Sequence, residues 1–236
     1  RRYMVGDCVD DALPSAATRC GVIVMNTPTA NSVATAEQTL TLMLAANRHT
    51  AQAHASLERG EWNRSDYVGT ELFEKTLGII GFGRIGRNVL RSIIESGRTD
   101  IEVVAINDLG PVETNAHLLQ YDSVHGRFPH PVTTTDTTID VGRGPMAVTA
   151  MRNPADLPWA DVDIVLECTG IFTSKEACQA HLENGSSRVL ISAPGKNTDK
   201  TIVYGVNDKT LTADDIVVSN ASCTTNCLAP VVKVLN

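Results

Sequence analysis

One short unit constrains the fold of this chain more than any other segment. An apolar run at residues 77–80 leads directly into the glycine-rich turn GFGRIG at residues 81–86. Apolar residues then recur at the spacing of one helix face up to Gly97, and a second apolar run at 101–106 ends in Asn107-Asp108. This order predicts a strand, a turn, a helix and a second strand in an α/β fold.

The spacing within this unit is typical of dinucleotide binding. Gly81 permits a tight turn, Gly83 lets the backbone approach a pyrophosphate, and Gly86 lets the helix pack closely on the strand. The helix N-terminus would face the phosphates. Asp108 follows about 20 residues later, where a carboxylate accepts hydrogen bonds from ribose hydroxyls and repels a 2′-phosphate. We therefore predict NAD as the cofactor.

The composition fits a parallel sheet that is buried on both faces. The chain has 236 residues, of which 42% are hydrophobic and only 4% aromatic, so the core is expected to be aliphatic. A net charge of −7 disfavours nucleic acid or an anionic membrane as a partner. No segment has the length of a membrane span, and no leader opens the chain. Since the six cysteines follow no disulfide spacing and are expected to be reduced thiols, a cytoplasmic location is expected. The first residue is Arg1 rather than methionine, which suggests a processed, clipped or partial product.

Later segments continue the α/β pattern. We expect a β-hairpin excursion at 133–148 around Gly142 and Gly144, strands at 163–168, 188–191, 202–206 and 216–218, and a helix at 175–183. Ligands of open parallel sheets bind beyond the carboxyl ends of the strands. Thr169, Gly170, Ser192 and Cys223 all follow such ends, so the prediction is a Rossmann-type, mostly parallel sheet with its site at that edge.

Cys223 is the candidate nucleophile. It lies in the segment SCTTNC at the start of an apolar run, and a helix N-terminus there would favour the thiolate that attacks carbonyls. All six histidines precede it in the sequence, so a general base is not evident. The six cysteines follow no disulfide or metal spacing, and no metal site is expected. Cys227 is expected to be a packing residue.

Six segments of the sequence carry a resemblance to a known family: GFGRIGRNVLR, VVAINDLG, NAHLLQYDSVHGRFP, VLECTGIFTSKE, ISAPGKN and SNASCTTNCLAPVVKVLN. They cover the chain from about residue 81 to residue 236. The family that they resemble is glyceraldehyde-3-phosphate dehydrogenase of the bacterial type, a glycolytic oxidoreductase. Erythrose-4-phosphate dehydrogenase is a close sister family, and these motifs leave it open.

The resemblance implies a mechanism and a set of site residues. Cys223 would form a thiohemiacetal with a phosphorylated aldehyde and then an acyl thioester, which inorganic phosphate would release. Ser222 and Thr224 would help to hold phosphate, and a homo-oligomer is the assembly implied. The residues expected along the NAD site, beside the three glycines, are Arg84, Ile85, Asp108, Arg152, Thr169, Gly170 and Ser192.

Two departures from the family pattern bear on activity. Ile80 stands where the family has an asparagine. The family's histidine base, its further phosphate-binding residues and its C-terminal helix would lie beyond residue 236, so the catalytic domain is expected to be largely absent. Loss of a positioned base costs about 10²- to 10⁴-fold in rate. We therefore expect the isolated chain to be weakly active or inactive.

The first third of the chain follows a different pattern. From Ser32 a helix is expected, with an apolar face formed by Val33, Ala36, Leu40, Met43 and Leu44, and a second helix at 51–59. The strand at 21–26 would lack a sheet of its own, so the first 30 residues are expected to be poorly ordered or irregularly docked. The segments AATRCGVIVMNTP, NSVATAEQTLTLMLAANR, AHASLERGEW and GTELFEKTLGIIG resemble D-3-phosphoglycerate dehydrogenase, although Ala30 replaces a usual glycine.

Together these patterns predict three parts and leave three functions open. The parts are a hydroxyacid-dehydrogenase-like segment at 1–76, an NAD-binding domain at 77–221 and the start of a catalytic domain at 222–236. The first function is a phosphorylating, NAD-dependent aldehyde dehydrogenase. The second is a D-3-phosphoglycerate dehydrogenase that oxidises a 2-hydroxy acid, and the third is a non-catalytic hybrid fragment that only binds NAD.

Overall fold

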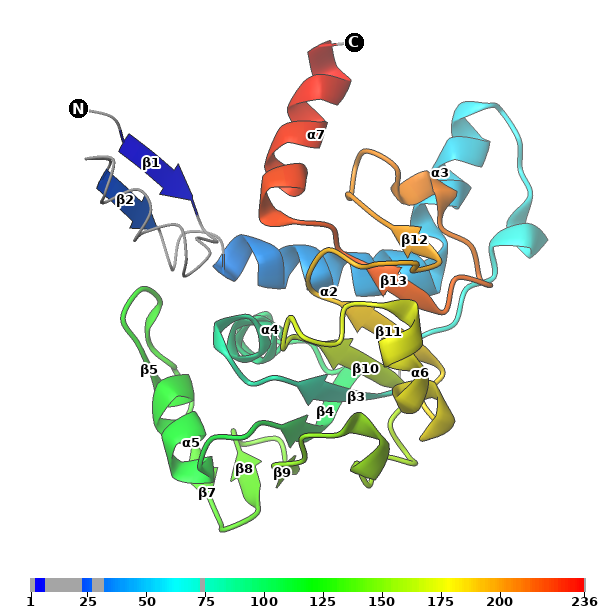
Figure 1. Ribbon diagram of the computed structural model, residues 1–236. Helices are drawn as coiled ribbons and strands as arrows, with labels where there is room; N and C mark the ends of the chain where they lie inside the picture. The colour runs from blue at the N-terminus through cyan, green and yellow to red at the C-terminus, as the bar shows by residue number, and fades with distance from the viewer. Residues whose placement is uncertain (1–2, 7–22, 27–31, 73–74, 236) are drawn as a thin grey trace.

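A nine-stranded, mostly parallel sheet is the frame of the computed structural model (Figure 1). The structure describes residues 3–6, 23–26, 32–72 and 75–235. In spatial order the strands are β12 (Lys200–Thr201), β13 (Val217–Ser219), β11 (Arg188–Ile191), β10 (Ile164–Glu167), β3 (Lys75–Ile80), β4 (Ile101–Asn107), β9 (Pro145–Thr149), β8 (Thr138–Asp140) and β7 (Thr133–Thr134). Within this sheet, as far as the structure describes it, only the β7–β8 and β8–β9 pairs are antiparallel. The α/β fold class predicted from the sequence is thus confirmed.

The order of the strands fixes where a ligand can bind. From β3 the chain continues on one side through β4 to β9, and it then returns to β10 on the other side of β3. The direction of winding therefore reverses between β3 and β10. In open parallel sheets the crevice outside the carboxyl ends at such a reversal is the usual binding site.

Each central strand buries residues on both faces of the sheet. Leu77 and Ile79 of β3 belong to the larger core cluster, whereas Ile80 belongs to a second cluster on the opposite face. Residues of β10 divide in the same way, with Leu166 on the first face and Val165 on the second. Burial on both faces explains the nearly continuous aliphatic runs in the sequence.

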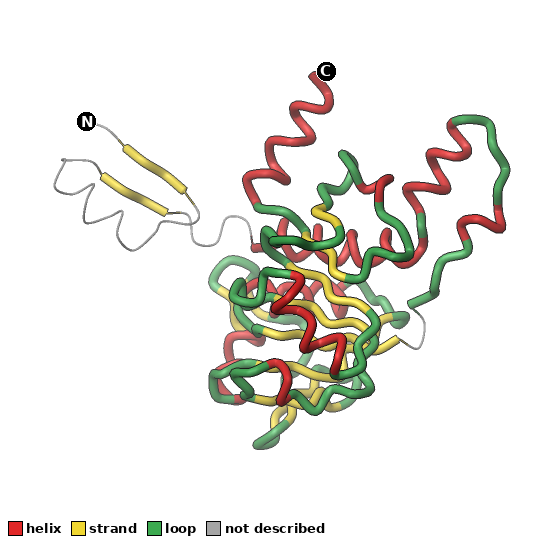
Figure 2. The backbone as a smooth tube through the Cα atoms, turned by 45° about the vertical axis from the view of Figure 1, so that its right-hand side comes forward, coloured by secondary structure: helices red, strands yellow, loops and turns green. Residues whose placement is uncertain are grey.

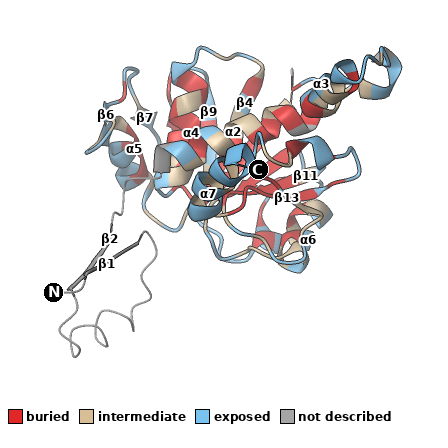
Figure 3. Ribbon diagram, turned by 90° about the horizontal axis from the view of Figure 1, so that it is seen from above, coloured by how far each residue is buried: buried red, intermediate tan, exposed pale blue. Residues whose placement is uncertain are grey.

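Helices cover both faces. On the first face α2 (Ser32–Arg48) lies beside α4 (Arg84–Glu95), and on the second face α6 (Lys175–Glu183) supplies the buried Cys178 (Figure 1). The remaining elements are α3 (Thr50–Glu58), α5 (Val112–Gln120), α7 (Cys223–Leu235), the short 3₁₀ helices η1 (Arg64–Tyr67), η2 (Pro154–Asp156) and η3 (Asp208–Thr210), and the hairpin of β5 (Tyr121–Asp122) and β6 (Gly126–Arg127). Figure 3 shows that α7 carries mainly exposed residues.

The apolar face predicted for α2 is largely confirmed. Ala36 and Met43 are buried, and Leu40 and Leu44 pack against the core from partly exposed positions; the side chain of Val33 lies outside the described residues. Leu42 is fully buried as well, although it is not part of the predicted face. The helix therefore presents a wider apolar face to the sheet than the predicted stripe.

The strand predicted at 202–206 is wrong, since β12 ends at Thr201. Ile202 and Val203 are buried, but the chain turns there because the Asn207 side chain forms hydrogen bonds with backbone groups that a strand would use for pairing. Its Oδ1 accepts from the Val203 N–H at 2.7 Å, and its Nδ2 donates to the Thr201 carbonyl at 2.9 Å. Asparagine side chains that bond nearby backbone favour turns over strands, whatever the apolar content.

The expectation that the strand at 21–26 has no partner is also wrong. β2 (Ile23–Asn26) pairs in parallel with β1 (Tyr3–Gly6), and Figure 2 shows this small sheet apart from the nine-stranded one. The prediction that the first 30 residues are poorly ordered or irregularly docked otherwise concerns positions outside the described residues.

Candidate active site

The carboxyl ends of six neighbouring strands form one continuous row. Thr149, Asn107, Ile80, Glu167, Ile191 and Ser219 are consecutive register partners across β9, β4, β3, β10, β11 and β13. The ladder extends one residue further, through bonds such as Gly81 N–H to Asn107 O at 2.8 Å and Cys168 N–H to Ile80 O at 2.7 Å. The segments that bear the predicted site residues therefore leave the sheet along one edge.

The glycine turn after β3 needs its glycines for steric reasons. Gly81 has a φ of 84°, in the left-handed region, and a Cβ there would lie 2.7 Å from the Thr169 backbone nitrogen. At Gly86 a Cβ would lie 2.3 Å from the Gly81 carbonyl oxygen. The turn after β3 thus contacts the loop after β10, and α4 packs directly on the strand.

Gly83 differs from these two glycines. It is exposed, its φ is −65°, and a Cβ there would meet nothing within 4 Å. It is the N-cap residue of α4 and, having no side chain, makes no capping hydrogen bond to this helix. Arg84 is exposed beside it, and Ile85 packs partly against the core. Backbone amides at an open helix N-terminus attract anionic groups such as phosphates.

Asp108 lies next to this turn. Its Oδ2 accepts from the Phe82 N–H at 2.9 Å, and its Oδ1 accepts from the Gly110 N–H at 2.8 Å and from Asn115 Nδ2 at 3.3 Å. A carboxylate has about four acceptor positions, so one remains for a further donor such as a ribose hydroxyl. Asp108 is half-buried and keeps access to solvent.

The remaining residues of the predicted NAD site lie on neighbouring loops. Thr169 and Gly170 follow β10, and Gly170 is exposed with a φ of 73°. Ser192 is buried after β11, where its N–H donates to the Glu167 carbonyl at 2.9 Å. Arg152 is exposed after β9. The structure thus brings all the predicted residues to the same edge, and their binding roles stay predictions.

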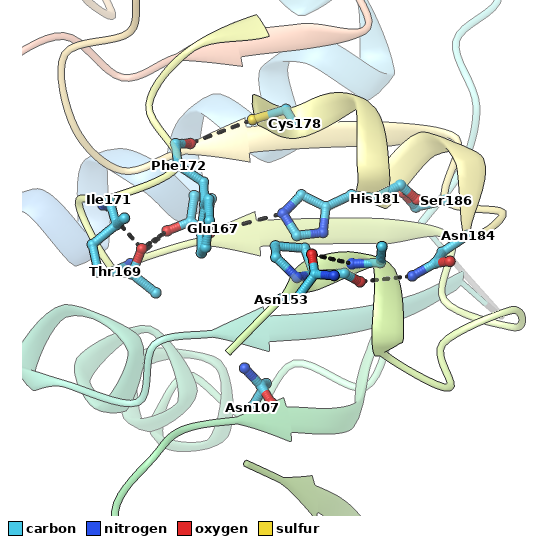
Figure 4. A network of polar contacts seen from close by, with 12 residues as sticks. Asn107, Asn153, Glu167, Thr169, Ile171, Phe172, Cys178, His181, Asn184 and Ser186 are labelled. Atoms are coloured by element: carbon cyan, nitrogen blue, oxygen red, sulfur yellow. Dashed lines mark hydrogen bonds and ion pairs between the residues drawn. The ribbon is translucent and has the colours of Figure 1, made fainter. Parts of the chain in front are cut away.

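A buried polar pair lies beneath this edge (Figure 4). Glu167 Oε2 and His181 Nε2 are 3.9 Å apart, both side chains are almost completely buried, and neither atom has a hydrogen-bond partner among the described residues. Burial raises the pKa of Glu167 to about 7 and lowers the pKa of His181 to about 4.

This pair is coupled to the predicted cofactor loop. The Thr169 N–H donates to Glu167 Oε1 at 2.7 Å, and the Thr169 hydroxyl bonds the same oxygen. Neither member was predicted from the sequence, since a glutamate at the end of a buried strand and a histidine on a helix have no local feature that pairs them.

Cys223 is the first residue of α7, as the apolar run predicts. Ser222 caps the helix, because its Oγ accepts from the Thr225 N–H at 3.0 Å. The same Oγ lies 3.0 Å from the Thr224 hydroxyl and 2.7 Å from the Thr225 hydroxyl. These hydroxyls gather beside a half-buried thiol, which makes no side-chain hydrogen bond within the described residues.

A pocket of about 550 Å³ opens along α7, lined by Thr224, Thr225 and apolar side chains that include Leu228 and Val232. Thr224 therefore borders space that a small molecule can enter. Cys227, one turn after Cys223, is exposed, so the expectation that it is a packing residue is wrong.

The other described cysteines are poor nucleophiles. Burial raises the pKa of Cys168 to about 12 and the pKa of Cys178 to about 12. A thiol must ionise to attack a carbonyl, so neither competes with Cys223 near neutral pH. All four described cysteines are free.

Two comparisons with known proteins agree with this geometry. Residues 75–175 match the family profile described as "Glyceraldehyde 3-phosphate dehydrogenase, NAD binding domain". This match confirms the NAD-binding domain predicted from the glycine turn and Asp108. Residues 1–74, which include α2 and α3, and the Cys223 segment lie outside the matched range.

Curated relatives extend the similarity. Proteins named glyceraldehyde-3-phosphate dehydrogenase from Cereibacter sphaeroides and Xanthobacter flavus are 74% and 70% identical over 160 and 162 residues. Another from Pseudomonas aeruginosa is 58% identical over 163 residues. Each alignment covers 68% of this chain and 48% or 49% of the relative. The chain thus spans about half the length of the curated relatives that it matches. No helix among the described residues is long and apolar enough to cross a membrane.

Proposed function

We propose that this chain carries the NAD site and the nucleophile of a phosphorylating aldehyde dehydrogenase of the glyceraldehyde-3-phosphate dehydrogenase type. One observation supports this most strongly: the glycine turn, Asp108, Thr169 and the segment leading to Cys223 leave the sheet at one edge, in consecutive register. The substrate would be a phosphorylated aldehyde such as glyceraldehyde 3-phosphate, and erythrose 4-phosphate is the sister candidate.

The residues at this edge fit NAD. The amides at the start of α4 would meet the pyrophosphate above Gly83, where no Cβ intervenes. Asp108 would accept from a ribose hydroxyl through its remaining acceptor position. Arg84, Ile85, Arg152, Thr169, Gly170 and Ser192 would line the rest of the site. NAD, when bound, would supply the hydride acceptor.

Cys223 would attack the aldehyde carbonyl, giving a thiohemiacetal whose sulfur–carbon bond is new and whose oxygen gains a proton. Loss of a hydride from that carbon to the bound NAD, together with loss of the hydroxyl proton to solvent, would leave a thioester on Cys223. Inorganic phosphate would then attack the thioester carbonyl, release an acyl phosphate and restore the thiol. The hydroxyls of Ser222 and Thr224 would donate hydrogen bonds to phosphate oxygens.

Turnover would be slow in this chain. The Cys223 thiol has no basic side chain as a hydrogen-bond partner within the described residues. A positioned base typically contributes about 10²- to 10⁴-fold to the rate. We therefore expect NAD binding and a reactive thiol, with weak dehydrogenase activity.

The segment at 1–76 supports a second candidate. Its resemblance to D-3-phosphoglycerate dehydrogenase concerns the part in which α2 and α3 lie, and it ends before any of that family's catalytic residues. A hybrid NAD-binding fragment without turnover is the third candidate. We also propose that the chain acts in the cytoplasm and that it forms homo-oligomers.

The first experiment is a calorimetric titration of the full chain with NAD, compared with Asp108→Ala and with the exposed Asp136→Ala as a matched control. Saturable binding that Asp108→Ala weakens about tenfold or more, and that Asp136→Ala leaves unchanged, would support the NAD site. Melting temperatures must accompany the titration, since Asp108 also bonds the Phe82 amide.

Three assays then separate the candidates. NADH formed from glyceraldehyde 3-phosphate, NAD and phosphate would support the aldehyde dehydrogenase, and loss of that signal in Cys223→Ser would identify the nucleophile. NADH formed from 3-phosphoglycerate would favour the second candidate. Saturable NAD binding with neither activity would support the third candidate, a hybrid NAD-binding fragment without turnover. A folded chain that does not bind NAD would contradict the proposal.

A further inference from the structure

Helix α2 covers the half of the sheet that leads to Cys223. Leu42 and Met43 line a small pocket together with Ile164 of β10, Leu190 of β11 and Val218 of β13. The helix lies outside the matched NAD-binding profile, which begins at residue 75. A segment outside that profile therefore packs against the strands that lead to the predicted nucleophile, and Figure 1 shows α2 along this half of the sheet.

The polar side chain of Thr39 in α2 contacts Asn220, which lies in the segment that leads to Cys223. Thr39 is 1% exposed, and its Oγ1 donates to the Thr35 carbonyl at 2.6 Å. The same oxygen accepts from Asn220 Nδ2 at 3.0 Å, a buried bond between residues 181 positions apart. The Thr39 hydroxyl thus uses its only proton within α2 and offers a lone pair to Asn220.

Asn220 connects three elements. Its N–H donates to the Ile191 carbonyl of β11 at 2.9 Å, and its own carbonyl accepts from Asn226 Nδ2 of α7 at 2.7 Å. Its side-chain amide is directed to α2, and its Oδ1 has no partner among the described residues. Without the Thr39 hydroxyl, the buried Nδ2 would keep only a 3.5 Å contact with the Thr35 carbonyl.

The segment between Asn220 and Cys223 has a strained backbone. Ala221 has a φ of 56°, which is unfavourable for a residue with a Cβ and persists only where neighbours enforce it. Ser219 does so in part, since its Oγ accepts from the Ala221 N–H at 3.1 Å and donates to the Ala193 carbonyl at 2.8 Å. Asn220 holds the other side of the same turn.

We infer that Thr39 is a positioning residue for Cys223, acting through Asn220 on the turn that starts α7. The inference relies on the proposed function only in taking Cys223 as the nucleophile. Loss of the hydroxyl would leave the Asn220 amide poorly paired and let the turn relax, which would loosen the first turn of α7. The thiol would then be less well aligned with the helix amides that favour thiolate.

The test measures alkylation of each cysteine in the full chain by iodoacetamide, followed by peptide mass spectrometry. Thr39→Val removes the hydroxyl at nearly constant volume, and Thr39→Ser retains it. Thr41→Val is the matched control, because Thr41 makes the same bond to the carbonyl four residues earlier, at 2.8 Å to Glu37. Its side chain is partly exposed, and the α2 partners of the Asn220 side chain among the described residues are Thr35 and Thr39.

In Thr39→Val we expect Cys223 to react about fivefold more slowly at pH 7, the factor of a typical net hydrogen bond. Its rate at pH 10, where thiols are ionised, should equal that of the wild type, and Cys227 should react equally in both. Thr39→Ser and Thr41→Val should match the wild type. A purely structural role would lower the melting temperature and leave the pH dependence of Cys223 alkylation unchanged.

Equal Cys223 rates in Thr39→Val and Thr41→Val would overturn the inference, as would a loss that persists at pH 10. Should Thr39→Val be insoluble, Thr39→Ala compared with Thr39→Ser gives the same contrast in hydroxyl content. A wild-type Cys223 that reacts no faster than Cys227 would instead refute the proposed nucleophile, which keeps the two failures distinct.

Discussion

The Asp108 carboxylate accepts a hydrogen bond of 2.9 Å from the Phe82 backbone N–H, which ties the end of β4 to the glycine turn after β3. The residue that we expect to bind ribose therefore also fixes the turn that we expect to bind pyrophosphate. Substitution of Asp108 changes both, so a loss of affinity there has two sources. Substitutions within the turn separate them.

Gly86→Ala should lower the stability of the fold, whereas Gly83→Ala should lower the affinity for NAD. At Gly86 a Cβ would lie 2.3 Å from a backbone oxygen, so this variant should lose about 1 to 3 kcal/mol of stability. At Gly83 the Cβ enters open space at a favourable φ, so stability should remain while NAD affinity falls. Thermal melts and NAD titrations of both variants test this, and an unchanged affinity in a folded Gly83→Ala would argue against pyrophosphate at that position.

Glu167→Gln should stabilise the protein at pH 8 and have little effect near pH 5. The pKa of Glu167 is raised from 4.5 to about 7 in the folded state, so the wild type is most favoured below pH 4.5 and loses this contribution as pH rises through 7. Glutamine does not ionise and keeps an acceptor for Thr169. The gain at pH 8 should be about 1 to 3 kcal/mol.

Urea unfolding at both pH values measures this difference. His181 remains in both proteins, so its lowered pKa, which costs stability as pH falls below about 6.5, cancels in the comparison. Glu102→Gln, at an exposed position on β4, serves as the control and should show no comparable pH-dependent gain. A gain of equal size at pH 5 and pH 8 would contradict the burial of an ionisable group as the cause.

Cysteine labelling should give a clear order of rates. Cys223 should react fastest at pH 7. The rates of Cys168 and Cys178 should be lower by a factor of about 100 or more, because burial raises both pKa values to about 12. Timed iodoacetamide labelling with mass spectrometry reads each site separately. Prior incubation with glyceraldehyde 3-phosphate should protect Cys223 alone. Protection of Cys227 instead would move the nucleophile by one helical turn.

Leu42→Ala should destabilise the NAD-binding domain although it lies outside the matched profile. Leu42 is fully buried against the sheet, and such truncations cost about 2 to 5 kcal/mol. Leu57→Ala on α3 is the matched control, since that side chain is 53% exposed and should cost little. A single cooperative unfolding transition that shifts only in Leu42→Ala would show that α2 and the sheet fold together. Equal midpoints for both variants would show that they do not.

Local pattern predicted the central elements well. The bounds expected for α6 and β11 agree with the structure at both ends, and β4 and β10 agree within one residue at each end. These segments are buried on both faces or have a strong apolar period, so local and tertiary preferences coincide. The glycine turn could also be predicted from the sequence, because the steric constraints at Gly81 and Gly86 require glycine at these positions.

Some missed features have only a weak local signal, and others depend on contacts between distant residues. The short helix α5 and the small β5–β6 hairpin carry weak periodicity and were not predicted. Neither the Glu167–His181 pair nor the Thr39–Asn220 bond has a local signal, because the pairing arises only when the sheet is formed. At Asn207, side-chain bonding to the backbone overrode an apolar run that suggested a strand.

The bond between Thr39 and Asn220 also sets the order in which the molecule can be completed. During synthesis α2 leaves the ribosome with Leu42 and Met43 long before β10, β11 and β13 exist to cover them. Contacts that join such distant positions form slowly, and apolar surface is exposed while they are pending. The turn before the nucleophile therefore closes on a helix that was made 181 positions earlier.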